Sequence, residues 1–243
     1  MNRVEGKVAI VTGGAKGMGF AHARALAAEG AKVALTDIDE VRGEAAAREI
    51  GDAVKFHSHD VASAGSWQAV VDKTEADFGP VNILINNAGI GYPVPVDELE
   101  EAEYRRFFEI NELGCFLGIK AVLGSMRRAG GGSIVNISSA CGLQALPNTI
   151  AYTATKFAVR GMTKATALDL GKDRIRVNSV HPALTRTDMC AEETVANLLG
   201  SVPLGRIGEV DEVSQLILFL ASDESSYCTG AEFVVDGGFT AGQ

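Results

Sequence analysis

Residues 7–19 read Lys-Val-Ala-Ile-Val-Thr-Gly-Gly-Ala-Lys-Gly-Met-Gly, an apolar run that leads directly into a glycine cluster. The run predicts a buried strand, and the helix-length segment that follows predicts a helix. Glycines at positions 13, 17 and 19 permit a tight turn and let backbone N–H groups at the helix N-terminus approach a diphosphate closely. We therefore expect Gly13, Lys16, Gly17, Met18 and Gly19 to cradle a dinucleotide.

The rest of the chain repeats this alternation of apolar strand and helix. Near-continuous apolar strands separated by helix-length segments are typical of a parallel sheet covered on both faces. No linker or repeat interrupts the series, so residues 1–243 are expected to form one α/β domain, a doubly wound Rossmann fold with seven parallel strands. The predicted strands are 7–11, 32–35, 54–56, 83–85, 133–137, 176–180 and 232–235. The predicted helices cover about 17–29, 40–50, 64–78, 101–128, 151–171 and 209–222.

Composition narrows the class of partner. The 243 residues carry a formal net charge of −9 and a pI near 5.0, which argues against nucleic acid and anionic membranes and favours a small-molecule ligand. No apolar run is long enough for a signal peptide or a membrane span, so we expect a cytoplasmic protein. Four scattered cysteines without a Cys-x-x-Cys pair indicate reduced thiols rather than disulfides or a zinc site.

Asp37 closes the second predicted strand, 18 residues beyond Gly19. A carboxylate there accepts hydrogen bonds from the ribose hydroxyls of a dinucleotide and repels a 2′-phosphate, which favours NAD over NADP. Ile38, the next residue, is also expected to contact the cofactor. Lys16 and Arg42 supply cations that would soften the rejection of NADP.

Tyr152 and Lys156 are four residues apart in a predicted helix, so their side chains share one face. The nearby ammonium is expected to lower the pKa of the phenol from its usual value of about 10, into the range of a general acid or base. Ser139 lies 13 residues upstream, after a predicted strand.

Together these motifs resemble the short-chain dehydrogenase/reductase family over essentially the whole chain. Within that family the chain is most similar to bacterial 3α,20β-hydroxysteroid dehydrogenases and nearby NAD-dependent secondary-alcohol dehydrogenases. The resemblance rests on Thr12-Gly13-x-x-x-Gly17-x-Gly19, Asp60, Asn86-Asn87-Ala88-Gly89, Asn111, Ser139, Tyr152-x-x-x-Lys156 and Asn178-Ser179-Val180-His181-Pro182.

The resemblance implies a catalytic set of Asn111, Ser139, Tyr152 and Lys156. Tyr152 would exchange a proton with the substrate oxygen while hydride moves to or from the nicotinamide, and Ser139 would hold that oxygen. Lys156 would also bind the nicotinamide ribose, and Asn111 would hold a water that links Lys156 to solvent.

Further cofactor contacts implied by the resemblance are Asp60, Val61, Asn87, Gly89, Thr185 and Thr187. One departure affects the last pair: the family usually has Pro-Gly after the sixth strand, whereas this chain has Pro182-Ala183. Because alanine lacks the freedom of glycine at positive φ, the loop is expected to take a somewhat different path.

Three irregular segments, 88–98, 139–150 and 182–208, follow the ends of strands and are expected to bind substrate. The residues 140–151 include no charged side chain, which favours a neutral, apolar secondary alcohol or ketone, with a hydroxysteroid as one possibility. We expect the substrate to contact Ser139, Cys141, Leu143, Leu146, Tyr152 and Met189, with 182–208 forming a lid.

Alternatives remain open at this point. A 3-ketoacyl-carrier-protein reductase would share the fold and the catalytic set but would use NADPH; Arg127 and Arg128 favour it, whereas Asp37 does not. A non-catalytic nucleotide-binding protein would not need the catalytic set. His57 and His59 alternate on a strand, but no third ligand follows at a recognisable spacing, so no metal is expected. The family resemblance also implies a homotetramer.

Overall fold

A computed structural model describes residues 2–190 and 192–242 and contains one seven-stranded parallel sheet. The strand order is β3-β2-β1-β4-β5-β6-β7. The strands are β1 Val8–Thr12, β2 Lys32–Asp37, β3 Val54–Ser58, β4 Ile83–Asn86, β5 Gly132–Ile137, β6 Ile175–Pro182 and β7 Glu232–Val235. Every predicted strand is present, and the predicted doubly wound fold is confirmed.

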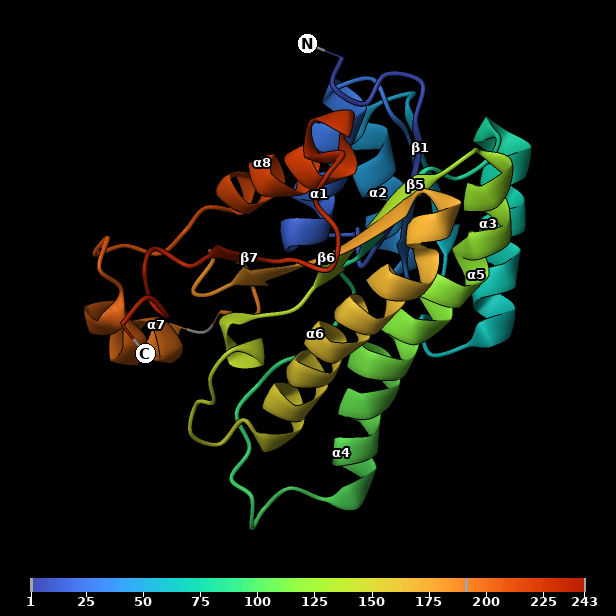
Figure 1. The fold of residues 1–243 in the computed structure, drawn as a ribbon. Coiled ribbons are helices and arrows are strands. Elements are labelled where there is room, and N and C mark those ends of the chain that lie inside the picture. Colours follow the sequence, from blue (N-terminus) through green and yellow to red (C-terminus); the bar gives the residue numbers. More distant parts are fainter. Residues whose placement is uncertain (1, 191, 243) are drawn as a thin grey trace.

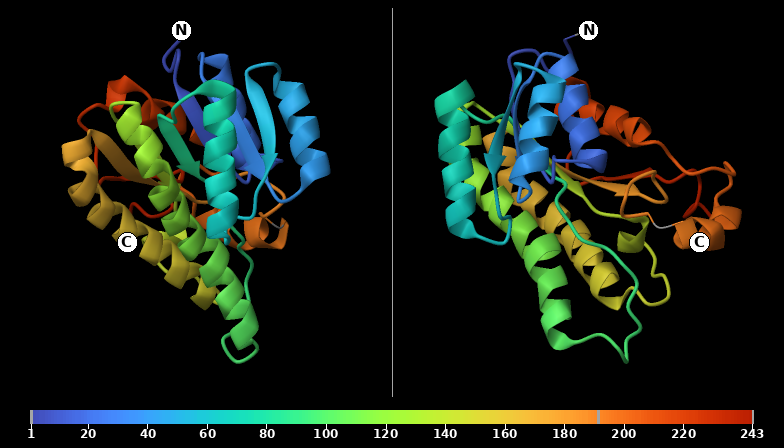
Figure 2. Two further views of the ribbon diagram at one scale, coloured as in Figure 1. Left: turned by 90° about the vertical axis from the view of Figure 1, so that its right-hand side faces the viewer. Right: turned by 180° about the vertical axis from the view of Figure 1, so that it is seen from behind.

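Helices cover both faces of the sheet (Figures 1 and 2). α1, α2 and α8 pack on one face, and α3, α5 and α6 pack on the other. The α-helices are α1 Gly17–Ala28, α2 Glu40–Ile50, α3 Ala64–Phe78, α4 Glu101–Phe107, α5 Gly114–Arg128, α6 Ile150–Leu170, α7 Glu192–Leu198 and α8 Val210–Ala221. Short 3₁₀ turns occur at Ala140–Gly142, Gly171–Asp173, Leu199–Ser201 and Asp223–Ser225.

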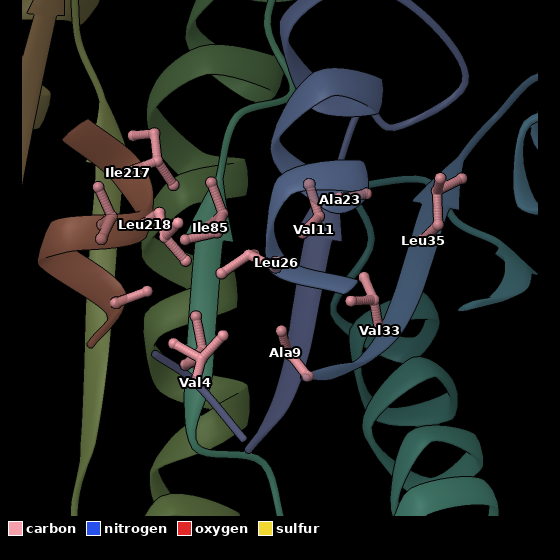
Figure 3. Packing of buried hydrophobic residues seen from close by; sticks show 14 of the residues in the cluster. Val4, Ala9, Val11, Ala23, Leu26, Val33, Leu35, Ile85, Ile217 and Leu218 are labelled. Atoms are coloured by element: carbon pink, nitrogen blue, oxygen red, sulfur yellow. The ribbon is translucent and has the colours of Figure 1, made fainter. Parts of the chain in front are cut away.

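Side-chain alternation along the strands produces two separate cores. In β1, Ala9 and Val11 point toward α1 and α8, whereas Ile10 points toward the opposite layer. Figure 3 shows the first of these cores, with Leu26 of α1 packed over β1 and β4. Because both faces are buried, the strands read as continuous apolar runs and polar groups gather at their ends.

The predicted helix 101–128 is not continuous. A π-helical turn, Phe108–Leu113, separates α4 from α5, and it carries Asn111. The wider turn places the Asn111 amide beside Ile90, where it forms two backbone hydrogen bonds. Hydrophobic periodicity does not register one extra residue in a helix, so the sequence prediction missed the interruption.

The segment 182–208, expected to be irregular, contains the short helix α7. Ala191, inside this expected substrate loop, lies outside the described residues, as do positions 1 and 243 of the expected domain. Among the helices described, none combines the length and the apolar character required to cross a bilayer.

Candidate active site

The glycine turn after β1 is closely packed. Gly13 and Gly17 have φ values of +64° and +59°, in the left-handed region that favours glycine. A Cβ on Gly19 would lie 2.1 Å from the Gly13 carbonyl oxygen and 2.6 Å from Asn87 Nδ2. Glycine is therefore required here both for the turn and for the close approach of α1 to the loop after β4.

The groups around this turn could hold a dinucleotide. No side chain caps the N-terminus of α1, so its first-turn N–H groups suit an anion such as a diphosphate. Asn87 donates through Nδ2 to the carbonyls of Thr12 and Gly13, but its buried Oδ1 has no partner among the described residues. A bound dinucleotide would supply acceptors for the N–H groups of α1 and a donor for Asn87 Oδ1.

Asp37 is fixed at the end of β2 by the backbone. Its carboxylate accepts from the N–H groups of Ala15 at 3.1 Å and Asp39 at 3.1 Å, which hold it beside the glycine turn. The two cations considered from the sequence have other partners: Lys16 pairs with Asp188 at 2.9 Å and Arg42 with Asp39 at 3.6 Å. Their charges are thus partly neutralised before any ligand arrives.

The remaining expected cofactor residues differ in exposure. Asp60 is exposed and Val61 is half-buried, and the Val61 carbonyl accepts from Trp67 Nε1 at 3.0 Å. Ile38 is 75% exposed. Met18 is half-buried and packs against the core on the α1 face.

The loop after β6 lies against the glycine turn that follows β1. The Thr187 methyl lies 3.6 Å from where a Gly17 Cβ would be, and Thr185 is buried beside Gly208. Apart from glycine, the described residues with positive φ are Asn2, Asn148 and Arg174. Ala183 therefore has a backbone conformation open to any residue, and replacing the usual glycine strains nothing.

Tyr152 and Lys156 lie on the first two turns of α6. Lys156 is 5% exposed, donates from Nζ to the Ile137 carbonyl at 2.8 Å, and lies 5.5 Å from the centre of the Tyr152 ring. The Ser139 side chain, just after β5, acts on the Tyr152 hydroxyl and lowers its pKa. A Cβ on Gly91 would lie 2.8 Å from Tyr152 Cε2, so glycine at this position leaves room for the ring.

The predicted direction of the Tyr152 shift is wrong for the protein without ligand. Burial raises the pKa of Tyr152 to about 12, outweighing the lowering effect of the Ser139 hydrogen bond. Burial also lowers the pKa of Lys156 to about 8. Removal from water is the larger effect on both groups.

Asn111 links this pair to the loop after β4. Its Oδ1 accepts from Ile90 N at 2.8 Å, and its Nδ2 donates to Ile90 O at 2.9 Å and to Thr155 Oγ1 at 3.2 Å. Gly89 lies between them: a Cβ there would be 3.1 Å from Asn111 Oδ1 and 3.6 Å from Lys156 Nζ. A buried cavity of about 10 Å³, bordered by Asn111, has room for about one water.

His181 forms a hydrogen bond with the backbone of Ser139. Because the Ser139 carbonyl can only accept, the 2.9 Å contact from His181 Nδ1 requires a proton on that nitrogen. Nε2 then accepts from Ser179 Oγ, also at 2.9 Å. Burial lowers the pKa of His181, so the neutral ring serves as a fixed spacer.

The expected substrate residues Cys141, Leu143, Leu146 and Met189 differ in how far they are exposed. Cys141 is buried beside Ser139, whose Oγ accepts from Cys141 N at 3.0 Å, and burial raises the pKa of the thiol. Leu143 is half-buried, and Met189 is 51% exposed. Leu146 borders a groove of about 420 Å³ together with Val96, Ala145, Asn148, Thr149, Ile150, Thr153 and Ala154.

Sequence reasoning missed Phe239. This side chain is 8% exposed and forms a small apolar cluster with Ala140, Val202, Leu146, Ala183 and Leu184. It therefore joins the 139–150 and 182–208 segments from a third, distant position. No local motif marks it; the signal available was an aromatic residue after the Asp236-Gly237-Gly238 turn, which follows the last strand.

The paired histidines have separate partners. His59 Nδ1 bonds to Thr36 Oγ1 at 2.9 Å, and His57 Nε2 lies 3.3 Å from Asp77. Burial lowers the pKa of His59 to about 4. Within residues 2–190 and 192–242, no group of three or more potential metal ligands occurs.

Comparison with known proteins identifies the family of the chain. A family profile described as enoyl-(acyl carrier protein) reductase matches residues 13–240. A 3-alpha-(or 20-beta)-hydroxysteroid dehydrogenase of Mycobacterium tuberculosis is 50% identical over 99% of this chain and 92% of its own length.

Two further relatives are similar over the same extent of the chain. A cyclopentanol dehydrogenase of Comamonas sp. is 47% identical over 99% of this chain and all of its own. An NADP-dependent (R)-specific alcohol dehydrogenase of Lentilactobacillus kefiri is 43% identical over 99% of both chains. The chain belongs to the short-chain dehydrogenase/reductase family of oxidoreductases.

Proposed function

We propose that the chain transfers a hydride between NAD(H) and a neutral, apolar secondary alcohol or ketone, with Tyr152 as general acid and base. The observation that carries this proposal is the grouping of the half-buried Tyr152 with two buried polar residues, Ser139 and Lys156, the latter on the same helix as Tyr152. Such a group can hold a substrate oxygen and exchange its proton.

Tyr152 and Ser139 divide the work on the substrate oxygen. In ketone reduction the Tyr152 phenol donates its proton to the carbonyl oxygen, while Ser139 donates a second hydrogen bond that stabilises the developing negative charge. In alcohol oxidation the phenolate accepts the hydroxyl proton. With a pKa of about 12 before ligands bind, Tyr152 is held in its acid form at neutral pH.

Lys156 and Asn111 act behind the phenol. Lys156 brings a positive charge within 5.5 Å of the ring centre, which favours the phenolate once it forms. Asn111, fixed by Ile90 and Thr155, positions the loop after β4 against Lys156. The small cavity beside Asn111 supports the role proposed for this residue, a water-mediated proton path.

NAD is the cofactor that these residues suit best. Gly13, Gly17 and Gly19 would admit the diphosphate, and Asp37 would bind the adenine ribose hydroxyls and repel a 2′-phosphate. When bound, the nicotinamide supplies the site that accepts or donates hydride. The name of the Lentilactobacillus relative shows that NADP use occurs in the family, so the position of Asp37 bears directly on this choice.

The substrate class follows from the walls of the site. Leu146, Ala183, Leu184 and Phe239 form an apolar cluster that joins two of the three expected substrate segments, 139–150 and 182–208, and the groove beside Leu146 is largely apolar. The names of the relatives, a hydroxysteroid dehydrogenase and a cyclopentanol dehydrogenase, point to cyclic secondary alcohols. We therefore favour a cyclic alcohol, with a hydroxysteroid among the candidates.

The structure weakens the argument from Arg127 and Arg128 for a carrier-protein reductase. Arg127 pairs with Asp173 at 2.7 Å and Arg128 forms an ion pair with Glu75, so both cations have carboxylate partners within the chain. An acidic carrier protein would have to compete with these partners. A purely nucleotide-binding role would leave the Ser139, Tyr152 and Lys156 arrangement without a purpose.

We propose a cytoplasmic homotetramer. All four cysteines are free, which suits a reducing compartment. Large apolar side chains are exposed along α4–α6: Phe108, Phe116, Phe157 and Leu168. Such a surface suits packing against the same helices of another copy. Light scattering at micromolar concentration tests the assembly, and a monomer would contradict it.

A substrate screen tests the activity. Steroids, cyclic alcohols, aryl ketones and small diols are assayed with NAD at alkaline pH and with NADH near neutrality, each repeated with NADP or NADPH. We expect turnover of neutral cyclic substrates with NAD(H) as the preferred cofactor. Absence of hydride transfer across the panel would contradict the function, and preference for NADPH with acyl-carrier substrates would favour the alternative.

A further inference from the structure

A further pocket lies at the opposite end of the sheet from the catalytic residues, at the end where the N-terminus lies (Figure 1). Its volume is about 490 Å³. It lies where β1, β4, β5 and β6 begin. Its lining includes the glycines 130–132 and Gly171, which directly follows α6. None of the residues expected to bind cofactor or substrate borders it.

The pocket gathers positive charge on an acidic protein. Lys7, Arg174 and Arg176 border it, and Asp223 is the carboxylate among its lining residues. Three cations against one carboxylate leave an excess of two positive charges, although the whole chain has a net charge of −9. An excess of this size matches a dianion.

Both arginines of this pocket, Arg174 and Arg176, lack an ion-pair partner among the described residues, which is unusual in this chain. Of the 13 arginines, all but Arg106, Arg174 and Arg176 form an ion pair within the described part of the molecule. Arg176 is half-buried and donates instead to the carbonyls of Leu220 at 2.9 Å and Ser222 at 3.0 Å. Asp223 attracts this half-buried guanidinium but forms its ion pair with Lys7, so positive charge in the pocket is left for an anion.

Arg174 is held in an unfavourable backbone conformation. It ends a 3₁₀ turn with φ +57° and ψ 31°, the left-handed region where glycine and asparagine are usual. The conformation is fixed on both sides, since Arg174 O accepts from Gly132 N at 3.1 Å and a Cβ on Gly131 would lie 2.6 Å from the same oxygen. The strained position places an exposed guanidinium at the pocket edge.

We propose that this pocket binds a phosphoryl dianion, either inorganic phosphate or the phosphate of a small monoester. Guanidinium groups match phosphate oxygens with two parallel hydrogen bonds, and a phosphate monoester carries close to two negative charges at neutral pH. The volume exceeds that needed for phosphate alone and leaves room for a small organic group. The site is separate from hydride transfer and does not depend on the proposed function.

Isothermal titration with inorganic phosphate and with glycerol 3-phosphate tests this site, at fixed ionic strength and with NADH in excess so that the glycine cradle is filled. We expect saturable binding of one equivalent. Arg174→Asn, which suits the left-handed backbone, should weaken binding by about tenfold or more, and Arg174→Lys should recover part of it. Whichever of the two compounds binds more tightly shows whether the pocket suits free phosphate or a phosphate monoester.

Arg106→Asn is the matched control, because Arg106 is also an exposed arginine without an ion pair but lies on α4. It should leave phosphate binding unchanged. Circular dichroism checks that each variant is folded, and the KM for NADH should be the same in all of them. Non-saturable heats with the wild-type protein, or equal affinity in wild type and Arg174→Asn, would overturn the proposal.

Discussion

The cofactor side and the substrate side of the same sheet edge are built by different means. On the cofactor side, backbone fits against backbone: the Gly19 position lies so close to the Gly13 carbonyl that a Cβ would be 2.1 Å away. On the substrate side, Leu146, Ala183 and Phe239 meet through apolar side chains from three separate segments. The first arrangement tolerates almost no change, whereas the second can be adjusted by one side chain at a time.

Gly19→Ala should have the largest effect on this comparison. Its Cβ cannot be placed without moving the turn, so we expect NADH affinity to fall by about tenfold or more and stability to drop by about 1–3 kcal/mol. Fluorescence titration and thermal unfolding measure the two effects. Gly161→Ala on α6 is the control, because nothing lies within 4 Å of its Cβ and alanine favours a helix. Normal NADH binding by Gly19→Ala would show that the cradle is not rigid.

Asp37→Asn tests the electrostatic part of the cofactor side. The amide keeps an acceptor for the Ala15 N–H but removes the charge that repels a 2′-phosphate. We expect the NAD-to-NADP ratio of kcat/KM to fall by about 10- to 100-fold. Glu49→Gln removes an exposed charge from the far end of α2, away from the glycine turn and from Arg42, so it should change the ratio far less. Equal ratios in both variants would place cofactor selection elsewhere.

Tyr152 should remain protonated in the free protein up to about pH 10. Because its folded pKa is raised to about 12, ionisation comes later than in an ordinary tyrosine. An ultraviolet difference titration of wild type against Tyr152→Phe measures this directly. Alcohol oxidation should quicken as pH rises, since the phenolate fraction increases. Ionisation near pH 8 without ligand would instead restore the view that Lys156 alone lowers the phenol pKa.

Phe239→Leu should produce a smaller, selective effect on the substrate side. Shortening the side chain loosens contact with Leu146 and Val202, so the KM for bulky cyclic ketones should change by about two- to fivefold while that for NADH stays constant. Phe233→Leu is the control, because Phe233 packs near Phe219 on the α8 face instead. Equal changes for bulky and small ketones would argue against a role for Phe239 in specificity.

The same contrast explains what the sequence could predict. The strands, the glycine turn and Asp37 follow from local patterns, because apolar runs and glycine spacing act over a few residues. Tyr152 and Lys156 were placed together by helical spacing alone. The π-helical turn at Asn111 and the position of Phe239 depend on tertiary contacts, so no local pattern contains them.

The pKa of Tyr152 was mispredicted for a related reason. Helical spacing reports that an ammonium is near the phenol, but it contains no measure of burial. In the structure Lys156 is 5% exposed and removal from water raises the pKa of Tyr152, whatever the neighbouring charge contributes. Electrostatic predictions from spacing therefore require the burial of the pair as well.

Single-turnover hydride transfer by Tyr152→Phe tests the central claim most directly. The account predicts that NADH binding is retained while the rate of ketone reduction falls by about 10²- to 10⁴-fold, because the proton donor is gone. Tyr227→Phe, at a fully exposed position, should behave as the wild type. A Tyr152→Phe protein that reduces ketones at the wild-type rate would contradict the account.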